Sequence, residues 1–219
     1  MRSMMTTNDK NISNILLVDK PKGISSYQVI RILQKKLGIK KMGHAGTLDP
    51  LATGLMLIGI NEGTKKLTAL LGLSKEYEAE ILMGIKTDTA DVDGKIIEEK
   101  QIPELSDEQI QATLLSMVGT LELAVPIYSA IKRQGKPLYE YARAGQEVSI
   151  PIKPMKVLSA EYIKKENNSI FVNFNVGSGT YIRSLAEEFA KRLETIATIK
   201  NLRRISIGEY SVRDAMKVD

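Results

Sequence analysis

The residues best suited to chemistry lie in one short stretch, Met42 to Gly59, with the sequence MGHAGTLDPLATGLMLIG. It contains the single histidine of the chain, His44, and an aspartate, Asp49, that directly precedes a proline. A residue before proline is kept out of the right-handed helical region, so Asp49 is expected in an extended or turn conformation. Because most Asp-Pro pairs are ordinary turns, the spacing alone leaves both a plain turn and a catalytic carboxylate open.

The segments on both sides of Asp49 are expected to hold it in place. Gly43, Gly46 and Gly54 allow tight turns or a close approach of the backbone to a ligand. The apolar run from Leu55 to Ile60, bounded by glycines, indicates a buried strand. Catalytic groups concentrate on loops carried by a rigid scaffold, so these surroundings suit a carboxylate whose position matters.

The composition excludes several kinds of site. The chain has 219 residues, of which 43% are hydrophobic, enough for one large domain or two small ones with a full core. The absence of cysteine and the single histidine exclude disulfides, thiolate metal sites and His-rich metal sites. There is no apolar run of about 18 residues and no signal-peptide stretch near the N-terminus. We therefore expect a cytoplasmic protein with no membrane span and no metal.

The charge is distributed unevenly along the chain, whose net charge is +5. Residues 1–44 carry nine Lys/Arg against two Asp/Glu, residues 45–123 six against fourteen, and residues 124–156 six against two. Two basic blocks thus flank an acidic one. The basic blocks would meet a polyanion such as RNA if the fold placed them on one face, but solvated surface is the common fate of lysines.

The second basic block interleaves positive charge with aromatic rings. Its sequence over residues 125–148 is VPIYSAIKRQGKPLYEYARAGQEV, with the basic residues Lys132, Arg133, Lys136 and Arg143 and the tyrosines Tyr128, Tyr139 and Tyr141. Cations beside rings that can stack on bases suit a single-stranded RNA loop. A surface helix with core-facing tyrosines is the alternative.

Residue patterns predict the elements that carry these groups. Residues 1–13 are polar and expected to form a flexible tail. We expect strands over residues 14–20, 55–60 and 74–83, two or three strands over 150–176 and a short one within 196–212; helices are expected over about 25–37, 62–71 and 106–118 and up to residue 193. In the strand over 74–83, alternation places Tyr77 on an apolar face.

Two other motifs do not fit the sites that they resemble at first sight. TDTADVDG, residues 87–94, would place the first position of a calcium loop at Thr89 and the last at Lys100, where carboxylates are needed. Asp93-Gly94 is therefore better interpreted as a tight hairpin turn. The glycine-rich turn before Arg183 has neither a phosphate-loop lysine nor the spacing of a dinucleotide site. A nucleotide cofactor is therefore not expected.

Several motifs together resemble one family. GHAGTLDPLATGLMLIG is similar to the catalytic motif of the TruB-type pseudouridine synthases, which make pseudouridine 55 in the T-loop of transfer RNA. DKPKGISS, which contains Lys20, resembles the family's first motif, and GSGTYIR, ending at Arg183, resembles the motif whose arginine pairs with the catalytic aspartate. Residues 125–150 resemble the RNA-gripping thumb, with Val125 where a proline is usual. The resemblance extends over about residues 15–215.

The resemblance implies a fold and a domain plan. It implies an α+β class, the pseudouridine synthase fold, with a mixed, largely antiparallel central sheet flanked by helices. Residues 14–219 would form the catalytic domain with its RNA-gripping insertion, without the small C-terminal RNA-binding domain that most bacterial relatives carry. Ala190 and Glu194 stand where the family often has glycines, which puts the end of that helix in doubt.

The resemblance also implies a reaction without a cofactor or metal. The N1–C1′ bond of a uridine breaks, the base rotates, and it rejoins the sugar through C5. Asp49 would act at the sugar, either as nucleophile or as base, and Arg183 would hold that carboxylate ionised and oriented. Tyr77 would stack on the uracil and could accept the C5 proton.

Further residues would contact the substrate or support the site. His44 would occupy the gap left in the RNA loop as the base flips out, and Lys20 would support the active-site loop. The remaining implied contacts are Tyr181 and Leu202 to the uridine, and Lys132 and Arg133 to the RNA.

The implied partner is the T-arm stem-loop of transfer RNA, bound by a monomer without a guide RNA. Two other functions stay open on the residues alone. A glycoside hydrolase also acts with a carboxylate at an anomeric carbon, but it needs a second carboxylate nearby. A non-catalytic RNA-binding or RNA-folding protein would tolerate Asp49→Asn, whereas a synthase would not.

Overall fold

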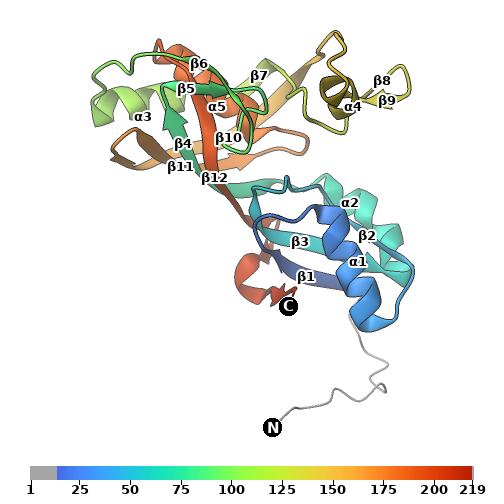
Figure 1. The fold of residues 1–219 in the computed structure, drawn as a ribbon. Helices are drawn as coiled ribbons and strands as arrows, with labels where there is room; N and C mark the ends of the chain where they lie inside the picture. The colour runs from blue at the N-terminus through green and yellow to red at the C-terminus, as the bar shows by residue number, and fades with distance from the viewer. Residues whose placement is uncertain (1–13, 219) are drawn as a thin grey trace.

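The computed structural model describes residues 14–218, and a large bent β-sheet runs through it (Figure 1). The tail expected over residues 1–13 lies outside the described residues. In chain order the elements are β1 (Ile15–Lys20), α1 (Ser26–Leu37), β2 (Met42–His44), β3 (Thr53–Ile60), η1 (Asn61–Lys66), α2 (Leu67–Leu71), β4 (Lys75–Met83), β5 (Ile85–Thr87), β6 (Ile96–Glu99), α3 (Asp107–Ser116), β7 (Gly119–Ala124), β8 (Lys132–Arg133), β9 (Lys136–Pro137), α4 (Leu138–Arg143), β10 (Ile152–Glu166), β11 (Ser169–Val176), α5 (Ile182–Arg192), β12 (Ala197–Ile207), β13 (Tyr210–Ser211), η2 (Val212–Asp214) and β14 (Met216–Lys217).

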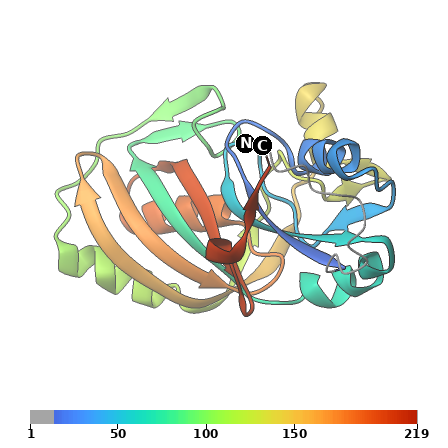
Figure 2. The same cartoon turned by 90° about the horizontal axis from the view of Figure 1, so that it is seen from below.

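Within residues 14–218, ten strands form the large sheet in the order β14-β1-β3-β12-β4-β11-β10-β7, with β2 paired to β3 and β13 paired to β12. The β1–β14 and β3–β12 pairs are parallel, and the other pairs in this sheet are antiparallel. Helices pack against the sheet on both sides of its bend, as Figures 1 and 2 show. The expected α+β class, with a mixed and largely antiparallel sheet flanked by helices, is confirmed.

Strand β12 joins the two halves of this sheet. It pairs with β4 along most of its length, but it pairs with β3 through Arg203 and Arg204, which lie opposite Thr53 and Gly54. In Figure 1, β1, β2 and β3 with α1 and α2 form the lower half, and β4, β7, β10 and β11 with α3 and α5 form the upper half. The loop between β2 and β3, residues 45–52, therefore emerges at the seam between the halves.

Helix α1 begins and ends where the sequence predicts. The Ser25 side chain accepts a hydrogen bond from the Gln28 backbone N–H, and the Gln28 side chain accepts one from the Ser25 N–H. This reciprocal capping box satisfies two N–H groups that the helix leaves unpaired. Gly38 ends the helix in the left-handed conformation. The apolar stripe of α1, which includes Leu33, packs into the main core.

The two strands beside the seam are buried as expected. In β3, the residues from Gly54 to Ile60 are all buried, because the two sides of this strand pack into two different apolar clusters. In β4, burial alternates, and Tyr77, Ala79 and Ile81 face the main core. Both strand predictions are confirmed.

Some elements differ from the sequence-based expectations. Residues 62–71 form a 3-10 turn followed by the short helix α2, and the single strand β12 is much longer than the short strand expected within 196–212. A register shift between Ile199 and Asn201 breaks the alternation of β12 and hides it from pattern reading. Strands β5 and β6 form a hairpin, but residues 88–95 make a longer loop than the tight turn expected at Asp93-Gly94.

Residues 125–150, which we call the thumb segment, project from one side of the molecule as the β8–β9 hairpin and helix α4 (Figure 1). A small apolar cluster that includes Val125, Leu138 and Met155 attaches the segment to the sheet. Its cations lie over its aromatic rings: Lys136 Nζ is 4.9 Å from the ring centre of Tyr141, and Arg143 Cζ is 5.3 Å from that of Tyr139.

Candidate active site

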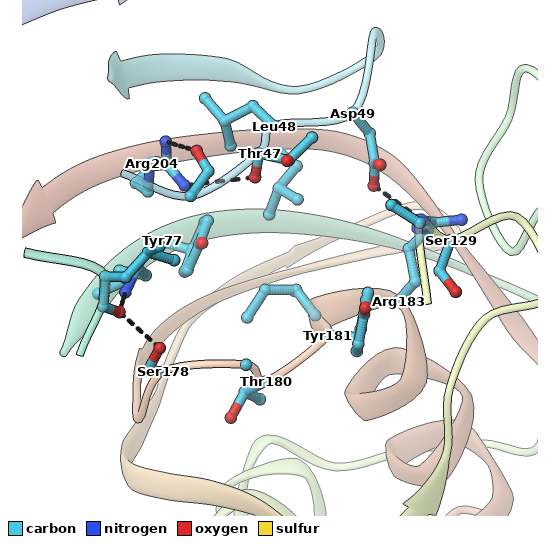
Figure 3. A pocket seen from close by; sticks show the side chains of 17 residues that line it. Thr47, Leu48, Asp49, Tyr77, Ser129, Ser178, Thr180, Tyr181, Arg183 and Arg204 are labelled. Atoms are coloured by element: carbon cyan, nitrogen blue, oxygen red, sulfur yellow. Dashed lines mark hydrogen bonds and ion pairs between the residues drawn. The ribbon is translucent and has the colours of Figure 1, made fainter. Parts of the chain in front are cut away.

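A cavity of about 270 Å³ opens at the seam of the sheet, bordered by the β2–β3 loop, strand β4, the start of helix α5 and the thumb segment (Figure 3). Most of the residues that the sequence singled out meet there. Its wall consists of Gly46, Thr47, Leu48, Asp49, Leu71, Lys75, Tyr77, Ser129, Ala130, Ser178, Gly179, Thr180, Tyr181, Ile182, Arg183, Leu202 and Arg204.

Asp49 and Arg183 form an ion pair at one end of the cavity. Asp49 Oδ2 lies 2.9 Å from Arg183 Nη2. The arginine side chain is only 4% exposed, whereas the aspartate side chain is 37% exposed. The pair thus presents a fixed carboxylate to the cavity, and this carboxylate offsets the cost of burying the Arg183 charge behind it.

Backbone carbonyls from two distant segments orient Arg183. Its Nη1 donates to the Thr89 carbonyl at 2.8 Å, and its Nη2 donates to the Tyr128 carbonyl at 3.0 Å. Thr89 belongs to the β5–β6 loop, and Tyr128 lies at the base of the thumb segment. No sequence pattern signals either hydrogen bond, because backbone carbonyls carry no residue-type information and both partners lie far away along the chain.

The β5–β6 loop also places a carboxyl group near this ion pair. Asp91 is 7% exposed, and its side chain accepts hydrogen bonds from the Thr89 hydroxyl at 2.7 Å and from the Asp93 N–H at 3.2 Å. Burial raises the pKa of Asp91, and the hydrogen bond from Thr89 and the charge of Arg183 oppose this increase. The segment considered as a calcium loop is therefore a support for Arg183.

Two buried side chains hold the middle of the β2–β3 loop. The Ser26 hydroxyl accepts a hydrogen bond from the Leu48 N–H at 2.8 Å and donates one to the Leu48 carbonyl at 2.9 Å. Lys20 Nζ donates to the carbonyls of Pro50 at 3.2 Å and Ile24 at 2.7 Å. Lys20 is fully buried, and this burial lowers its pKa to about 8. The structure therefore places Lys20 behind the loop, in a supporting position, and not in the cavity wall.

Arg204, on strand β12, connects the start of the same loop to strand β3, which follows the loop. Its Nε donates to the Leu55 carbonyl at 2.6 Å, its Nη2 to the Gly46 carbonyl at 3.1 Å, and its Nη1 to the Thr47 carbonyl at 3.5 Å. Arg204 is 1% exposed. The sequence-based prediction missed this residue, since nothing in its spacing distinguishes it from the exposed arginines of the chain.

Three expected substrate contacts line the cavity. Tyr77 is 7% exposed on β4, and Leu202 is 8% exposed on β12. Tyr181 precedes the first turn of α5, and burial raises the pKa of its hydroxyl. Figure 3 shows Tyr77 beside Arg204 and Tyr181 beside Arg183, on opposite sides of the space into which Asp49 points.

Other expected contacts lie outside the cavity wall. His44 lies in strand β2; burial lowers its pKa first, and the charge of Arg204 lowers it further. Its Nδ1 is buried without a hydrogen-bond partner in the described part of the chain. Lys132 and Arg133 form the exposed strand β8 of the thumb segment. These three residues could reach only the part of a substrate that remains outside the cavity.

Two other kinds of site are absent from residues 14–218. No group of three or more His, Asp or Glu side chains in this range is arranged to hold a metal ion. No helix in the same range is long and apolar enough to cross a membrane.

Comparisons with known proteins agree on one family. Residues 34–182 match the model of the TruB family pseudouridylate synthase (N terminal domain). The chain is 42% identical over 210 residues to a tRNA pseudouridine synthase B of Mesoplasma florum, covering 95% of this chain and 73% of that protein. It is 41% identical over 199 residues to the protein of the same name from Xanthomonas axonopodis pv. citri, covering 91% and 65%. The chain thus spans about two thirds of the length of these relatives.

The fold has close counterparts among solved structures. A chain in the structure of an H/ACA RNP bound to a substrate RNA containing 2′-deoxyuridine superposes with a TM-score of 0.70. The match covers 93% of this chain and 50% of that one, at 22% sequence identity. Such a likeness supports the pseudouridine synthase fold that the motifs implied, and the family match agrees with it. The chain therefore belongs to the TruB family of pseudouridylate synthases, which are isomerases.

Proposed function

We propose that this protein converts uridine to pseudouridine in transfer RNA, at position 55 of the T-loop. The observation that supports this most strongly is the Asp49–Arg183 ion pair, in which a buried arginine fixes a carboxylate that faces a cavity lined by Tyr77. The family match and the names of the relatives agree with this activity.

The cavity suits a base that has left its stack. Tyr77 provides an aromatic face, and Leu202 and Ile182 provide apolar wall. Extrusion of a nucleotide costs a few kcal/mol, and the cost is lower in a loop than in a duplex. A uridine of the T-loop would enter with its base against Tyr77 and its sugar at Asp49, while His44 fills the gap that the base leaves.

Asp49 then acts at the sugar. Its carboxylate either attacks C1′ or removes the proton from C2′; in both cases the N1–C1′ bond breaks and its electron pair goes to the uracil. The base rotates within the cavity, and C5 bonds to C1′ as the bond between Asp49 and C1′ breaks or, on the other route, as Asp49 returns the proton to C2′. The C5 proton is finally removed, with Tyr77 of the cavity wall as the candidate acceptor. Arg183 keeps the carboxylate in place throughout.

The RNA outside the cavity would lie along the thumb segment. Lys132 and Arg133 on β8 are exposed, and Lys136 and Arg143 lie over tyrosine rings next to them. Such a surface offers phosphate contacts and stacking to a single-stranded loop. We infer that a monomer binds the T-arm without a guide RNA.

A glycosidase function is less consistent with the cavity. Both types of glycosidase need two carboxyl groups within about 5–10 Å on either side of the bond that is cleaved. Asp49 is the one carboxylate among the described residues that form this wall. Isomerisation needs a single carboxylate, so the wall supports the synthase.

The test is to map pseudouridine in transfer RNA after incubation with the protein. Unmodified transfer RNA is treated with a carbodiimide that marks pseudouridine, and reverse-transcription stops locate the mark. We expect one new stop at position 55, and none in a transfer RNA that carries cytidine there. A stop at another position would mean that the protein modifies a different uridine, and the absence of any stop would contradict the proposal.

A further inference from the structure

Two buried cations in the cavity wall have no role in the reaction described above. Lys75 on β4 is 6% exposed, and Arg204 on β12 is 1% exposed. Within residues 14–218, neither forms an ion pair with a carboxylate. Buried charges are normally paired, because removal from water is costly. Two unpaired ones in the same wall therefore need an explanation.

Both cations have N–H groups to spare. Lys75 Nζ donates to the Leu71 carbonyl at 2.8 Å and to the Leu73 carbonyl at 2.7 Å, which uses two of its three N–H donors. Arg204 donates to three carbonyls from its five N–H donors, and the bond to Thr47 is long at 3.5 Å. One donor of Lys75 and two of Arg204 thus remain for a ligand.

The two side chains converge beside Tyr77. Arg204 is the direct cross-strand partner of Tyr77, and Lys75 lies two residues before Tyr77 on the same face of β4. A methyl group placed on Gly46 would lie 3.5 Å from both Arg204 Nη1 and Lys75 Cε. Figure 3 shows Arg204 and Tyr77 together on the side of the cavity away from the Asp49–Arg183 pair. An aromatic ring stacked on Tyr77 would meet both cations at its edge.

The positive charges repel one another in the absence of a negative group. Burial lowers the pKa of Lys75 to about 8, and the neighbouring charge of Arg204 contributes to the decrease. Asp49 does not neutralise them, since its carboxylate is paired with Arg183. A negative charge that arrived or developed in this part of the cavity would be strongly stabilised, because the site is largely shielded from water.

We propose that Lys75 and Arg204 form an electropositive subsite for the uracil ring and stabilise the negative charge that the ring acquires when its glycosidic bond breaks. This inference rests on the proposed function. When the N1–C1′ bond breaks, its electron pair moves onto the ring and spreads to the carbonyl oxygens. These oxygens accept hydrogen bonds from the free N–H groups of Lys75 and Arg204. C1′, which loses the electron pair of the broken bond, gains either a bond from Asp49 or the electrons of the C2′–H bond, whose proton Asp49 takes.

A backbone phosphate is a less suitable occupant. Arg204 is almost completely buried and is the cross-strand neighbour of the tyrosine that would stack on the base. A flipped base enters such a pocket, whereas its phosphates stay near the mouth with the exposed cations of the thumb segment. The subsite therefore serves the base.

The experiment varies the leaving group as well as the protein. Lys75→Gln removes the charge but keeps an amide that can donate to the Leu71 and Leu73 carbonyls, and Lys75→Arg keeps the charge. Lys95→Gln, at an exposed lysine outside the cavity, is the matched control. Each protein is tested under single-turnover conditions on T-arm RNAs that carry uridine or 5-fluorouridine at the target. Loss of the N-linked nucleoside is followed by nuclease digestion and chromatography, and the melting temperature of each variant is recorded.

The fluorine withdraws electrons and makes the ring anion more stable in itself, so it partly replaces the cation. We expect Lys75→Gln to slow the loss of uridine on the order of 10²-fold, to slow the loss of 5-fluorouridine much less, and to leave RNA affinity nearly unchanged. Lys75→Arg should recover most of the rate. An equal loss on both substrates, or no loss, would overturn the subsite while wild-type turnover left the proposed function intact. Failure of the wild type on both RNAs would overturn both.

Discussion

At the scale of single residues, buried polar side chains hold every position of the loop from Gly46 to Pro50. Arg204 binds the carbonyls of Gly46 and Thr47, Ser26 binds both backbone groups of Leu48, Arg183 binds the Asp49 carboxylate, and Lys20 binds the Pro50 carbonyl. A carboxylate must approach the sugar in one orientation to react efficiently, and small displacements are costly. The loop is thus positioned residue by residue by side chains from strands and helices on both sides of the seam.

Ser26 offers the cleanest test of this positioning. Ser26→Ala would leave the N–H and carbonyl of Leu48 buried without a partner, which costs about 1–3 kcal/mol of stability. Asp49 follows Leu48 directly, so we expect kcat to fall by about 10-fold to 100-fold while KM for transfer RNA changes little. Single-turnover kinetics and thermal unfolding measure both effects.

The neighbouring serine supplies the control. Ser25 caps helix α1 by accepting a hydrogen bond from the Gln28 N–H, whereas the hydrogen bonds to the Leu48 backbone come from Ser26. Ser25→Ala should cost about 1 kcal/mol of stability and leave kcat close to that of the wild type. If the two variants reduced stability and kcat in the same proportion, Ser26 would be a structural residue without a positioning role.

The depressed pKa of Lys75 predicts a pH-dependent stability. Its pKa is about 8 in the folded protein and 10.5 when unperturbed. Between these values the unfolded chain binds more protons than the folded one, so the free energy of unfolding rises with pH through this window. Lys75→Met cannot titrate there. We therefore expect the melting temperature of the wild type to increase relative to that of Lys75→Met as the pH rises from about 8 to 10.5. A difference in melting temperature that stays constant over this range would mean that Lys75 has an ordinary pKa.

At the scale of elements, the parallel contact between β3 and β12 sets the site. Gly54 has a φ of +103°, and a Cβ on this residue would collide with the backbone of Arg204. A glycine is therefore required for β12 to approach β3 closely. The approach also brings the Arg204 side chain under the β2–β3 loop, so one glycine connects the packing of the two strands to the geometry of the site.

Gly54→Ala should separate these strands. We expect a large loss of stability together with loss of turnover, because the collision is with backbone that cannot rotate away. Gly23→Ala is the control: Gly23 also has a positive φ of +88°, but a Cβ there meets nothing within 4 Å. Its cost should be limited to backbone strain of about 1–2 kcal/mol. Chemical denaturation of both variants gives the comparison, and equal losses would show that backbone strain alone determines the need for glycine at position 54.

The thumb segment predicts how RNA binding responds to salt. Replacing Lys132, Arg133 and Lys136 together by alanine should weaken binding of a T-arm RNA and reduce the slope of log affinity against log salt by roughly one for each phosphate that is no longer neutralised. The charge-matched control replaces Lys95, Lys100 and Lys191, which lie around β6 and at the end of α5. Fluorescence anisotropy across a salt series measures both. If the slope of log affinity against log salt were unchanged in the first variant, the RNA would bind elsewhere than on the thumb segment.

At the scale of the whole molecule, the sequence predicts the elements better than the site. The apolar run of β3, the alternation around Tyr77 and the serine caps of α1 and α3 are local signals, and the structure confirms these elements. The full length of strand β12 was not predicted, because buried polar residues and a register shift interrupt its alternation of apolar and polar residues. The ion pair of Asp49 and Arg183 was suggested by family resemblance, since no local pattern connects residues so far apart in the chain.

Apart from Lys20, which the family resemblance implied, the supporting residues of the site could not be predicted from the sequence. Ser26 and Arg204 act through backbone groups that lie far away along the chain, and Thr89 and Tyr128 contribute carbonyls that every residue has. A serine or an arginine is common on surfaces, and its burial becomes visible only when the sheet has formed. The proposed catalytic carboxylate thus lies in one motif that the sequence reveals, whereas its positioning depends on the whole fold.

The decisive measurement is tritium release from a transfer RNA labelled at C5 of uridine, with Asp49→Asn beside the wild type. Asparagine keeps the shape of the side chain but cannot serve as a nucleophile or a base. We expect the wild type to release tritium from the T-loop, and Asp49→Asn to release none while it binds the RNA within a few-fold of the wild-type affinity. Release by Asp49→Asn at a rate near that of the wild type would show that the Asp49 carboxylate does not perform the reaction.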